Sequence, residues 1–294
     1  MAATVPMQEA QPGAPWLPAA AAGKDLRGDI EKVIAGRQAT IGVAVMCGDT
    51  VITVNNSRKY PLMSVFKLHV AVTALRKMDA EGIPLDSTVL IRSEQLHENT
   101  YSPLRDRYPG QDIRISYRDI VGYTVSHSDN NTCDLLISFL GGIDKVDSCI
   151  KSLGITDLNL TETEADMHED IRNGYLNWST PMSVVRLFEK IYSGEILSTE
   201  HSAFLERILL ECSSGQDKLK AGLPGNVPVA HKTGHSDRLP DGTMIGDADA
   251  GAIYMPDGRK CYVSVLIMDS KETDEVNAGV MAEIAGIVYR YFKI

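Results

Sequence analysis

The sequence predicts an α/β protein of the α+β type, in which both ends of the chain build one five-stranded antiparallel sheet. Strand-like segments gather near the two ends, and segments with helical spacing fill the middle. We expect terminal helices to flank the sheet and an all-helical lobe to be inserted between its second and third strands. The chain then divides into a flexible leader at 1–23, a discontinuous α/β lobe at 24–63 plus 213–294, and a helical lobe at 64–212.

Local patterns place the elements of the α/β lobe in order. Residues 24–36 have helical spacing, and a Gly-Asp turn joins two strand-like runs into a hairpin. A Pro-Asp-Gly-Arg turn separates the last two strands, and an amphipathic helix follows them. The expected strands are 40–47, 51–56, 228–233, 251–255 and 261–268, and the final helix is 275–292.

Composition excludes several classes of protein. A net charge of -10 argues against nucleic acid or an anionic membrane as a partner, and no apolar run approaches the ~20 residues needed to cross a bilayer. The five cysteines are odd in number and scattered, so we expect neither a disulfide framework nor a zinc site. Residues 1–23 lack the basic and apolar regions of an intact signal peptide.

The most informative residue is Lys67, the only charge in the apolar segment 62–75. This segment predicts a helix buried on most of its circumference. An unpaired ammonium there would cost several kcal/mol, so we expect a polar partner or a shifted pKa. Ser64 lies three residues earlier on the same helical face, where a lysine can activate its hydroxyl as a nucleophile. The alternative is a lysine that extends to the surface.

Two further motifs give this pair a context. A Ser-Asp-Asn run at 128–130 has the alternative of an ordinary helix cap, and a Lys-Thr-Gly run at 232–234 has that of an exposed strand edge with a glycine bulge. The order Ser-x-x-Lys, Ser-Asp-Asn, Lys-Thr-Gly resembles the penicillin-recognising serine enzymes, the β-lactamases and penicillin-binding proteins. The resemblance covers about 24–294 and implies the β-lactamase/penicillin-binding transpeptidase-like fold.

The segment 161–171 distinguishes between these enzymes. It carries five acids, which could be a solvated acidic loop. Class A β-lactamases have a glutamate on an omega loop, expected here around 158–181, and the family spacing to Met167-His168 selects Glu164, with Glu162 as the alternative. The residues that flank the three motifs are similar to those of the extended-spectrum, cefuroximase-type subgroup of Bacteroides-like bacteria. The chain is therefore identified as a class A serine β-lactamase.

The resemblance also implies a role for each site residue. Ser64 would form the acyl-enzyme, giving its proton to Lys67 or, through a water, to Glu164. Ser128 would protonate the departing lactam nitrogen in the positive field of Lys232, and Glu164 would activate the deacylating water. The implied substrate-binding residues are Asn130, Thr233, Gly234, His235, Tyr101, His168 and Lys218.

Some positions depart from the family pattern. His235, whose backbone N–H would form the oxyanion hole with that of Ser64, stands where Ser or Thr is usual. Many members of the family have an arginine on the neighbouring strand, but no arginine occupies 248–249 here. Lys218 is therefore expected to supply the positive charge, as a point charge in place of a guanidinium. No arginine near Glu162 braces the omega loop, which is therefore expected to fold differently or be looser.

The expected protein is a periplasmic, monomeric serine β-lactamase that hydrolyses penicillins or cephalosporins, confers antibiotic resistance and needs no cofactor or metal. Tyr101 would wall the entrance of its site, or else be a partly buried core tyrosine. One alternative is a D,D-peptidase, a penicillin-binding protein, and another is a non-hydrolytic β-lactam sensor domain. Both alternatives lack a deacylating glutamate, and a sensor needs a membrane-spanning segment.

Overall fold

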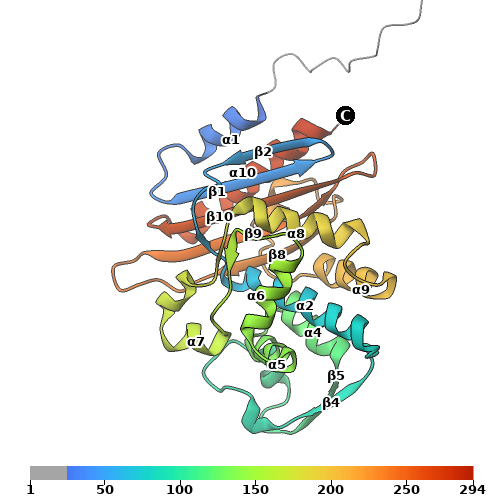
Figure 1. Ribbon diagram of the computed structural model, residues 1–294. Helices are drawn as coiled ribbons and strands as arrows, with labels where there is room; N and C mark the ends of the chain where they lie inside the picture. Colours follow the sequence, from blue (N-terminus) through green and yellow to red (C-terminus); the bar gives the residue numbers. More distant parts are fainter. Residues whose placement is uncertain (1–24, 294) are drawn as a thin grey trace, which may run out of the picture.

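The computed structural model describes residues 25–293 and contains the predicted five-stranded antiparallel sheet, in the order β2-β1-β10-β9-β8 (Figure 1). β1 pairs with β10 as well as with β2, so strands from the two ends of the chain lie side by side. This confirms the predicted fold class. The strands are β1 (Thr40–Cys47), β2 (Thr50–Val54), β8 (Val229–His235), β9 (Met244–Tyr254) and β10 (Lys260–Ser270).

The beginning of β9 differs from the prediction, which starts this strand at residue 251. The strand already begins at Met244, and it carries Asp247 and Asp249, which are 1% and 0% exposed. Each of these carboxylates has a basic partner, Lys218 and His231 respectively. Buried charged pairs remove the apolar alternation that identifies a strand, and the sequence pattern therefore missed this half of β9.

Helices cover both faces of the sheet. α1 (Leu26–Ile34) and α10 (Asp274–Phe292) pack together on one face, where Ile30 and Ile284 belong to one buried cluster with Val43 and Val265 of the sheet (Figure 1). α8 (Pro181–Ser193) packs against β1, β9 and β10.

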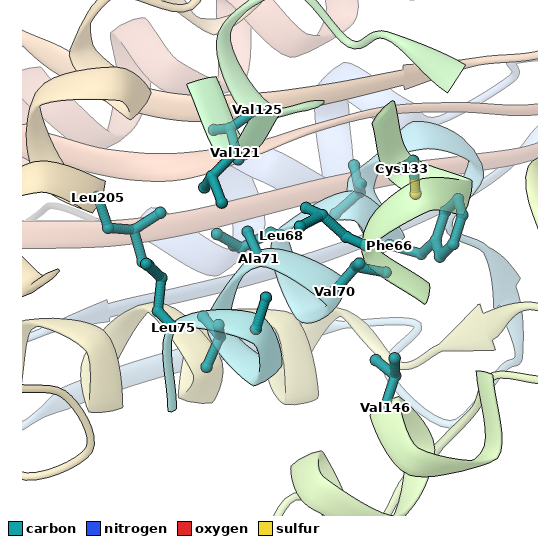
Figure 2. Close-up of a cluster of buried hydrophobic side chains, with 14 of the residues drawn as sticks. Phe66, Leu68, Val70, Ala71, Leu75, Val121, Val125, Cys133, Val146 and Leu205 are labelled. Carbon is teal, nitrogen blue, oxygen red and sulfur yellow. The ribbon is translucent and has the colours of Figure 1, made fainter. Parts of the chain in front are cut away.

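The helical lobe is built around α2 (Phe66–Glu81), which confirms the predicted buried helix. Figure 2 shows Phe66, Leu68 and Leu75 of α2 among side chains from the surrounding helices. A 3-10 turn, η1 (Met63–Val65), precedes α2 and carries Ser64. The surrounding helices are α4 (Tyr117–Ser126), α5 (Asn130–Leu140), α6 (Ile143–Ser152) and α9 (Thr199–Leu210).

Short elements close the loops around this lobe. β6 and β7 pair at the two ends of the predicted omega loop, so the loop is tied at its base. The loop itself contains α7 and η3. The short elements are β3 (Tyr60–Pro61), β4 (Thr88–Ile91), β5 (Ile113–Ser116), β6 (Leu158–Asn159), β7 (Trp178–Ser179), α3 (Pro103–Arg107), α7 (Glu164–Glu169), η2 (Ser93–Gln95), η3 (Ile171–Tyr175) and η4 (Leu219–Gly222).

One cysteine pair corrects the expectation that the cysteines form no disulfide. Cys47 and Cys261 are directly opposite in the β1–β10 register and are disulfide-bonded, with Cα atoms 4.4 Å apart. They are 214 residues apart in sequence. The sequence alone gave no reason to pair them, because their proximity depends on the strand order.

The predicted lobe boundaries stay a prediction, and the leader at 1–23 lies outside the described residues. Within 25–293, no helix has both the length and the apolar character needed to cross a membrane.

Candidate active site

Lys67 lies at the centre of a buried polar cluster at the start of α2. Its side chain is fully buried, and Nζ donates to Ser64 Oγ at 3.0 Å and to Asn130 Oδ1 at 2.6 Å. Nζ also donates to the Ser128 carbonyl at 2.8 Å and lies 2.9 Å from Glu164 Oε1. The lysine therefore does not extend to the surface. Its burial is tolerated because these contacts replace the hydrogen bonds to water that Nζ loses.

The Ser-Asp-Asn run joins α4 to α5, and it both caps a helix and reaches the lysine cluster. Asp129 is the N-cap of α5 and accepts from the Thr132 N–H at 2.9 Å. Ser128 has a φ of 57°, a left-handed conformation that is strained for serine. The Ser128 hydroxyl lies between two ammonium groups, 3.4 Å from Lys67 Nζ and 2.9 Å from Lys232 Nζ.

The Lys-Thr-Gly run lies on β8, at the edge of the sheet but buried. Burial, together with the positive charge of Lys67, lowers the pKa of Lys232 to about 8, although nearby Cys212 acts to raise it. Gly234 allows β8 to lie directly against η1. A Cβ at Gly234 would be 2.5 Å from the Leu62 carbonyl oxygen and 3.0 Å from the Ser64 nitrogen, so only glycine fits there.

The omega loop brings Glu164 to the cluster. Glu164 is the first residue of α7, Thr163 is the N-cap of this helix, and the Glu164 side chain is 10% exposed. Glu162 has its backbone N–H bonded to Asn177 Oδ1 at 2.9 Å, and among the described residues it makes no ion pair with Lys67. The register that selects Glu164 therefore agrees with the geometry.

A pocket of about 830 Å³ opens in front of this cluster. Ser64, Ser128, Asn130, Glu164 and Thr233 reach it from four different segments of the chain. The other predicted site residues that line it are Tyr101, His168, Gly234 and His235. The pocket is open to solvent on the Tyr101 side, where this side chain is 61% exposed. Tyr101 is therefore not a core tyrosine.

Lys218 does not line this pocket. It is 7% exposed, and Nζ donates to Asp247 Oδ1 at 2.5 Å and to the Gly234 carbonyl at 3.3 Å. His235 lies over the same carboxylate, with Nδ1 3.4 Å from Asp247 Oδ1, while its Nε2 is 3.8 Å from Asp274 Oδ2. Asp247 already neutralises Lys218, which argues against the predicted direct contact between Lys218 and a substrate.

A nucleophile, a buried lysine, a second serine and a carboxylate thus meet at the wall of one pocket. A family model described as the beta-lactamase enzyme family matches residues 25–292. The chain belongs to this family.

Relatives narrow this β-lactamase to class A. It is 44% identical over 268 residues to a β-lactamase of Bacteroides uniformis, covering 90% of each chain, and 34% identical to the extended-spectrum β-lactamase PER-1 of Pseudomonas aeruginosa, covering 90% of this chain and 87% of PER-1. A class A β-lactamase structure from Bacteroides cellulosilyticus superimposes with a TM-score of 0.88 at 48% identity, covering 90% of this chain and 96% of that one. The predicted family, class and subgroup are confirmed.

A buried asparagine and a partly buried aspartate of this β-lactamase hold the omega loop where the expected arginine is absent. Asn177 is fully buried. Its Oδ1 accepts from the Thr161 and Glu162 N–H groups, each at 2.9 Å, and its Nδ2 donates to the Glu162 carbonyl at 2.8 Å. Asp134 of α5 accepts from the Glu164 N–H at 2.9 Å and from the next N–H at the same distance. The loop is braced by an amide and a carboxylate, not left loose.

Sequence reasoning missed both residues. An asparagine before a strand and an aspartate inside a helix are ordinary there, and only the paired loop ends bring Asn177 to residues 161 and 162. Burial raises the pKa of Asp134 to about 6, with the Glu164 charge adding to it, although the loop N–H groups oppose the shift.

Proposed function

We propose that this class A β-lactamase hydrolyses the lactam amide of penicillins and cephalosporins through an acyl-enzyme on Ser64. The single observation that carries the proposal is the position of Lys67 Nζ, 3.0 Å from Ser64 Oγ and 2.9 Å from Glu164 Oε1. One ammonium thereby connects the nucleophile to the carboxylate needed for deacylation. This connection favours a hydrolase over a D,D-peptidase or a sensor.

Acylation begins when Lys67 gives one proton to Glu164 and, as a neutral amine, takes the proton of the Ser64 hydroxyl. The Ser64 oxygen then attacks the lactam carbonyl carbon. The backbone N–H groups of Ser64 and His235 stabilise the oxyanion, supported by the close approach of β8 to η1 at Gly234. These donors need no reorganisation during the reaction.

Collapse of the tetrahedral intermediate breaks the carbon–nitrogen bond. Ser128 donates its proton to the departing nitrogen and takes one from Lys67, 3.4 Å away. Lys67 then recovers the proton held by Glu164, so the carboxylate is again a base. Lys232, 2.9 Å from the Ser128 hydroxyl, stabilises negative charge on that oxygen during the transfer.

Deacylation uses Glu164 as general base. It removes a proton from a water that attacks the ester carbon, and the Ser64 oxygen leaves and is reprotonated through Lys67. Asn130 and Tyr101 line the pocket beside the acyl group, and Thr233 with Lys232 holds the substrate carboxylate by charge-assisted contacts. His168 and His235 also line the pocket.

The relatives support an extended-spectrum substrate range, because the name of PER-1 describes that activity. We also propose that the protein acts as a monomer in the periplasm and gives antibiotic resistance there. The Cys47–Cys261 disulfide supports this location, since disulfides persist in oxidising compartments.

A chromogenic cephalosporin assay combined with intact-mass spectrometry tests the function. Multiple turnovers without a lasting adduct are expected. A stable one-to-one adduct without turnover would contradict the proposal and favour a sensor or a penicillin-binding protein.

A further inference from the structure

A second buried polar cluster lies directly behind the Lys-Thr-Gly segment of β8. His231 is fully buried, and its Nδ1 lies 2.8 Å from Asp249 Oδ1 on β9. Its other nitrogen, Nε2, has no hydrogen-bond partner among the residues of 25–293. Cys212, which follows α9, is 2% exposed beside this ring. The proposed mechanism uses none of these three side chains.

The charges in this cluster reinforce one another. Burial acts to lower the pKa of His231, but the Asp249 carboxylate overrides it and raises this pKa to about 9. Burial likewise acts to raise the pKa of Cys212, yet the His231 ring, with help from Lys232, lowers it to about 6. The side chains therefore form a carboxylate–imidazolium–thiolate series at neutral pH.

Two hydroxyl groups connect this series to the pocket. Cys212 Sγ is 3.4 Å from Ser214 Oγ, and Ser214 Oγ is 2.5 Å from Thr233 Oγ1. Ser214 and Thr233 both line the pocket. A hydroxyl has one proton to donate, and a thiolate can only accept. The Ser214 proton therefore goes to the sulfur, and the close Thr233 hydroxyl donates to Ser214.

We propose that Cys212, with His231 behind it, is a positioning residue that draws the hydroxyl protons of Ser214 and Thr233 inward and so weakens the hold of Thr233 on a substrate carboxylate. The inference rests on the proposed function, in which Thr233 binds that carboxylate. Lys218 cannot compensate, because Asp247 neutralises it outside the pocket.

The charge of Cys212 also determines whether the Thr233 proton is available to the substrate carboxylate. If the group at position 212 is neutral, Ser214 donates to Thr233, and Thr233 has its proton free for the carboxylate. The titratable groups around Cys212 are His231 and Lys232 from β8, with Asp249 of β9 on the far side of the His231 ring, and Lys220 of η4, whose Nζ donates to the Cys212 carbonyl at 3.3 Å. Of these titratable side chains, Cys212 is the one that contacts the Ser214 hydroxyl.

The test compares Cys212→Ser, Cys212→Ala and Ser214→Ala with the wild type, using a chromogenic cephalosporin as its free carboxylate and as its methyl ester. We expect each variant to lower KM for the free acid about fivefold, the equivalent of one ordinary hydrogen bond, with the effect on KM rather than kcat. The ester should not discriminate between the proteins. Ser214→Ala keeps the inference testable if the Cys212 variants fold poorly.

Ser213→Ala is the matched control, because the Ser213 hydroxyl donates to the Ser126 carbonyl at 3.0 Å instead. It should keep the wild-type KM. Below about pH 6 the wild-type KM should approach that of Cys212→Ser, which has no thiol to titrate. An unchanged or higher free-acid KM in Ser214→Ala and Cys212→Ser, or an equal change with the ester, overturns the inference. A wild type without turnover would instead refute the proposed function.

Discussion

Glu164→Gln should convert the enzyme from one that turns over to one that stops at the acyl-enzyme. The glutamine has the size of the glutamate, and its amide oxygen can still accept from Lys67 Nζ at the 2.9 Å position. An amide cannot take a proton from water at neutral pH. The deacylation step therefore loses its general base, worth about 3 to 5 kcal/mol, or about 10² to 10⁴ in rate.

Acylation should be affected less, although the glutamine cannot take the proton that Lys67 gives to Glu164 in the wild type. In the variant, Lys67 releases this proton to water in the pocket that Ser64 lines, and the neutral amine then takes the Ser64 proton. Lys67 keeps Ser64 Oγ, the Ser128 carbonyl and Asn130 Oδ1 as partners, so the nucleophile stays oriented. Intact-mass spectrometry after mixing with a cephalosporin should show one covalent adduct per protein, persisting while the wild type has returned to its free mass. A burst of one equivalent of product should accompany it.

Glu162→Gln is the matched control on the same loop. The backbone of Glu162 holds the loop through Asn177, and its carboxylate is not paired with Lys67. This variant should turn over at the wild-type rate without an adduct. If Glu162→Gln accumulates the adduct and Glu164→Gln does not, the loop register and the reasoning built on it are refuted.

Three further outcomes are expected. Asn177→Ala should lower the free energy of unfolding by about 3 kcal/mol in urea titration, because two N–H groups and a carbonyl of the omega loop lose their hydrogen-bond partner. It should also slow deacylation, and an unchanged urea midpoint would show that Asn177 does not hold the loop. KM for an anionic substrate should rise above about pH 8, as Lys232 loses the charge that it carries below its pKa, whereas a flat KM up to pH 10 would show that Lys232 does not hold the carboxylate. Cys47→Ser together with Cys261→Ser should cost about 2 to 5 kcal/mol in thermal unfolding, and the wild type in reductant should match it.

The sequence was sufficient to predict contacts between residues that are close together along the chain. Ser64 and Lys67 are one helical turn apart in an apolar segment, so both burial and mutual contact follow from spacing alone. The resemblance to the family then placed the three distant motifs in one site. It also selected Glu164 over Glu162, because that choice depends only on the spacing to neighbouring residues of the same loop.

The remaining features depend on contacts between distant segments. Asn177 meets the loop because β6 and β7 pair, and Cys47 meets Cys261 because β1 adjoins β10. Lys218 has the right charge and spacing for the missing arginine, yet its partner Asp247 lies on a part of β9 that has no apolar pattern. Spacing along the chain cannot reveal a partner on another strand.

The strand order also has a consequence for how the protein comes into being. The central pair β1–β10 joins residues 40–47 to residues 261–268. A ribosome that has released only the first two hundred residues has exposed β1 and β2 without β8, β9 or β10, so most of the sheet is still missing. The long-range pairing delays completion of the sheet until synthesis is nearly finished. Until then β1 exposes the edge that β10 covers in the finished protein, so the order of synthesis leaves the central strand pair to form last.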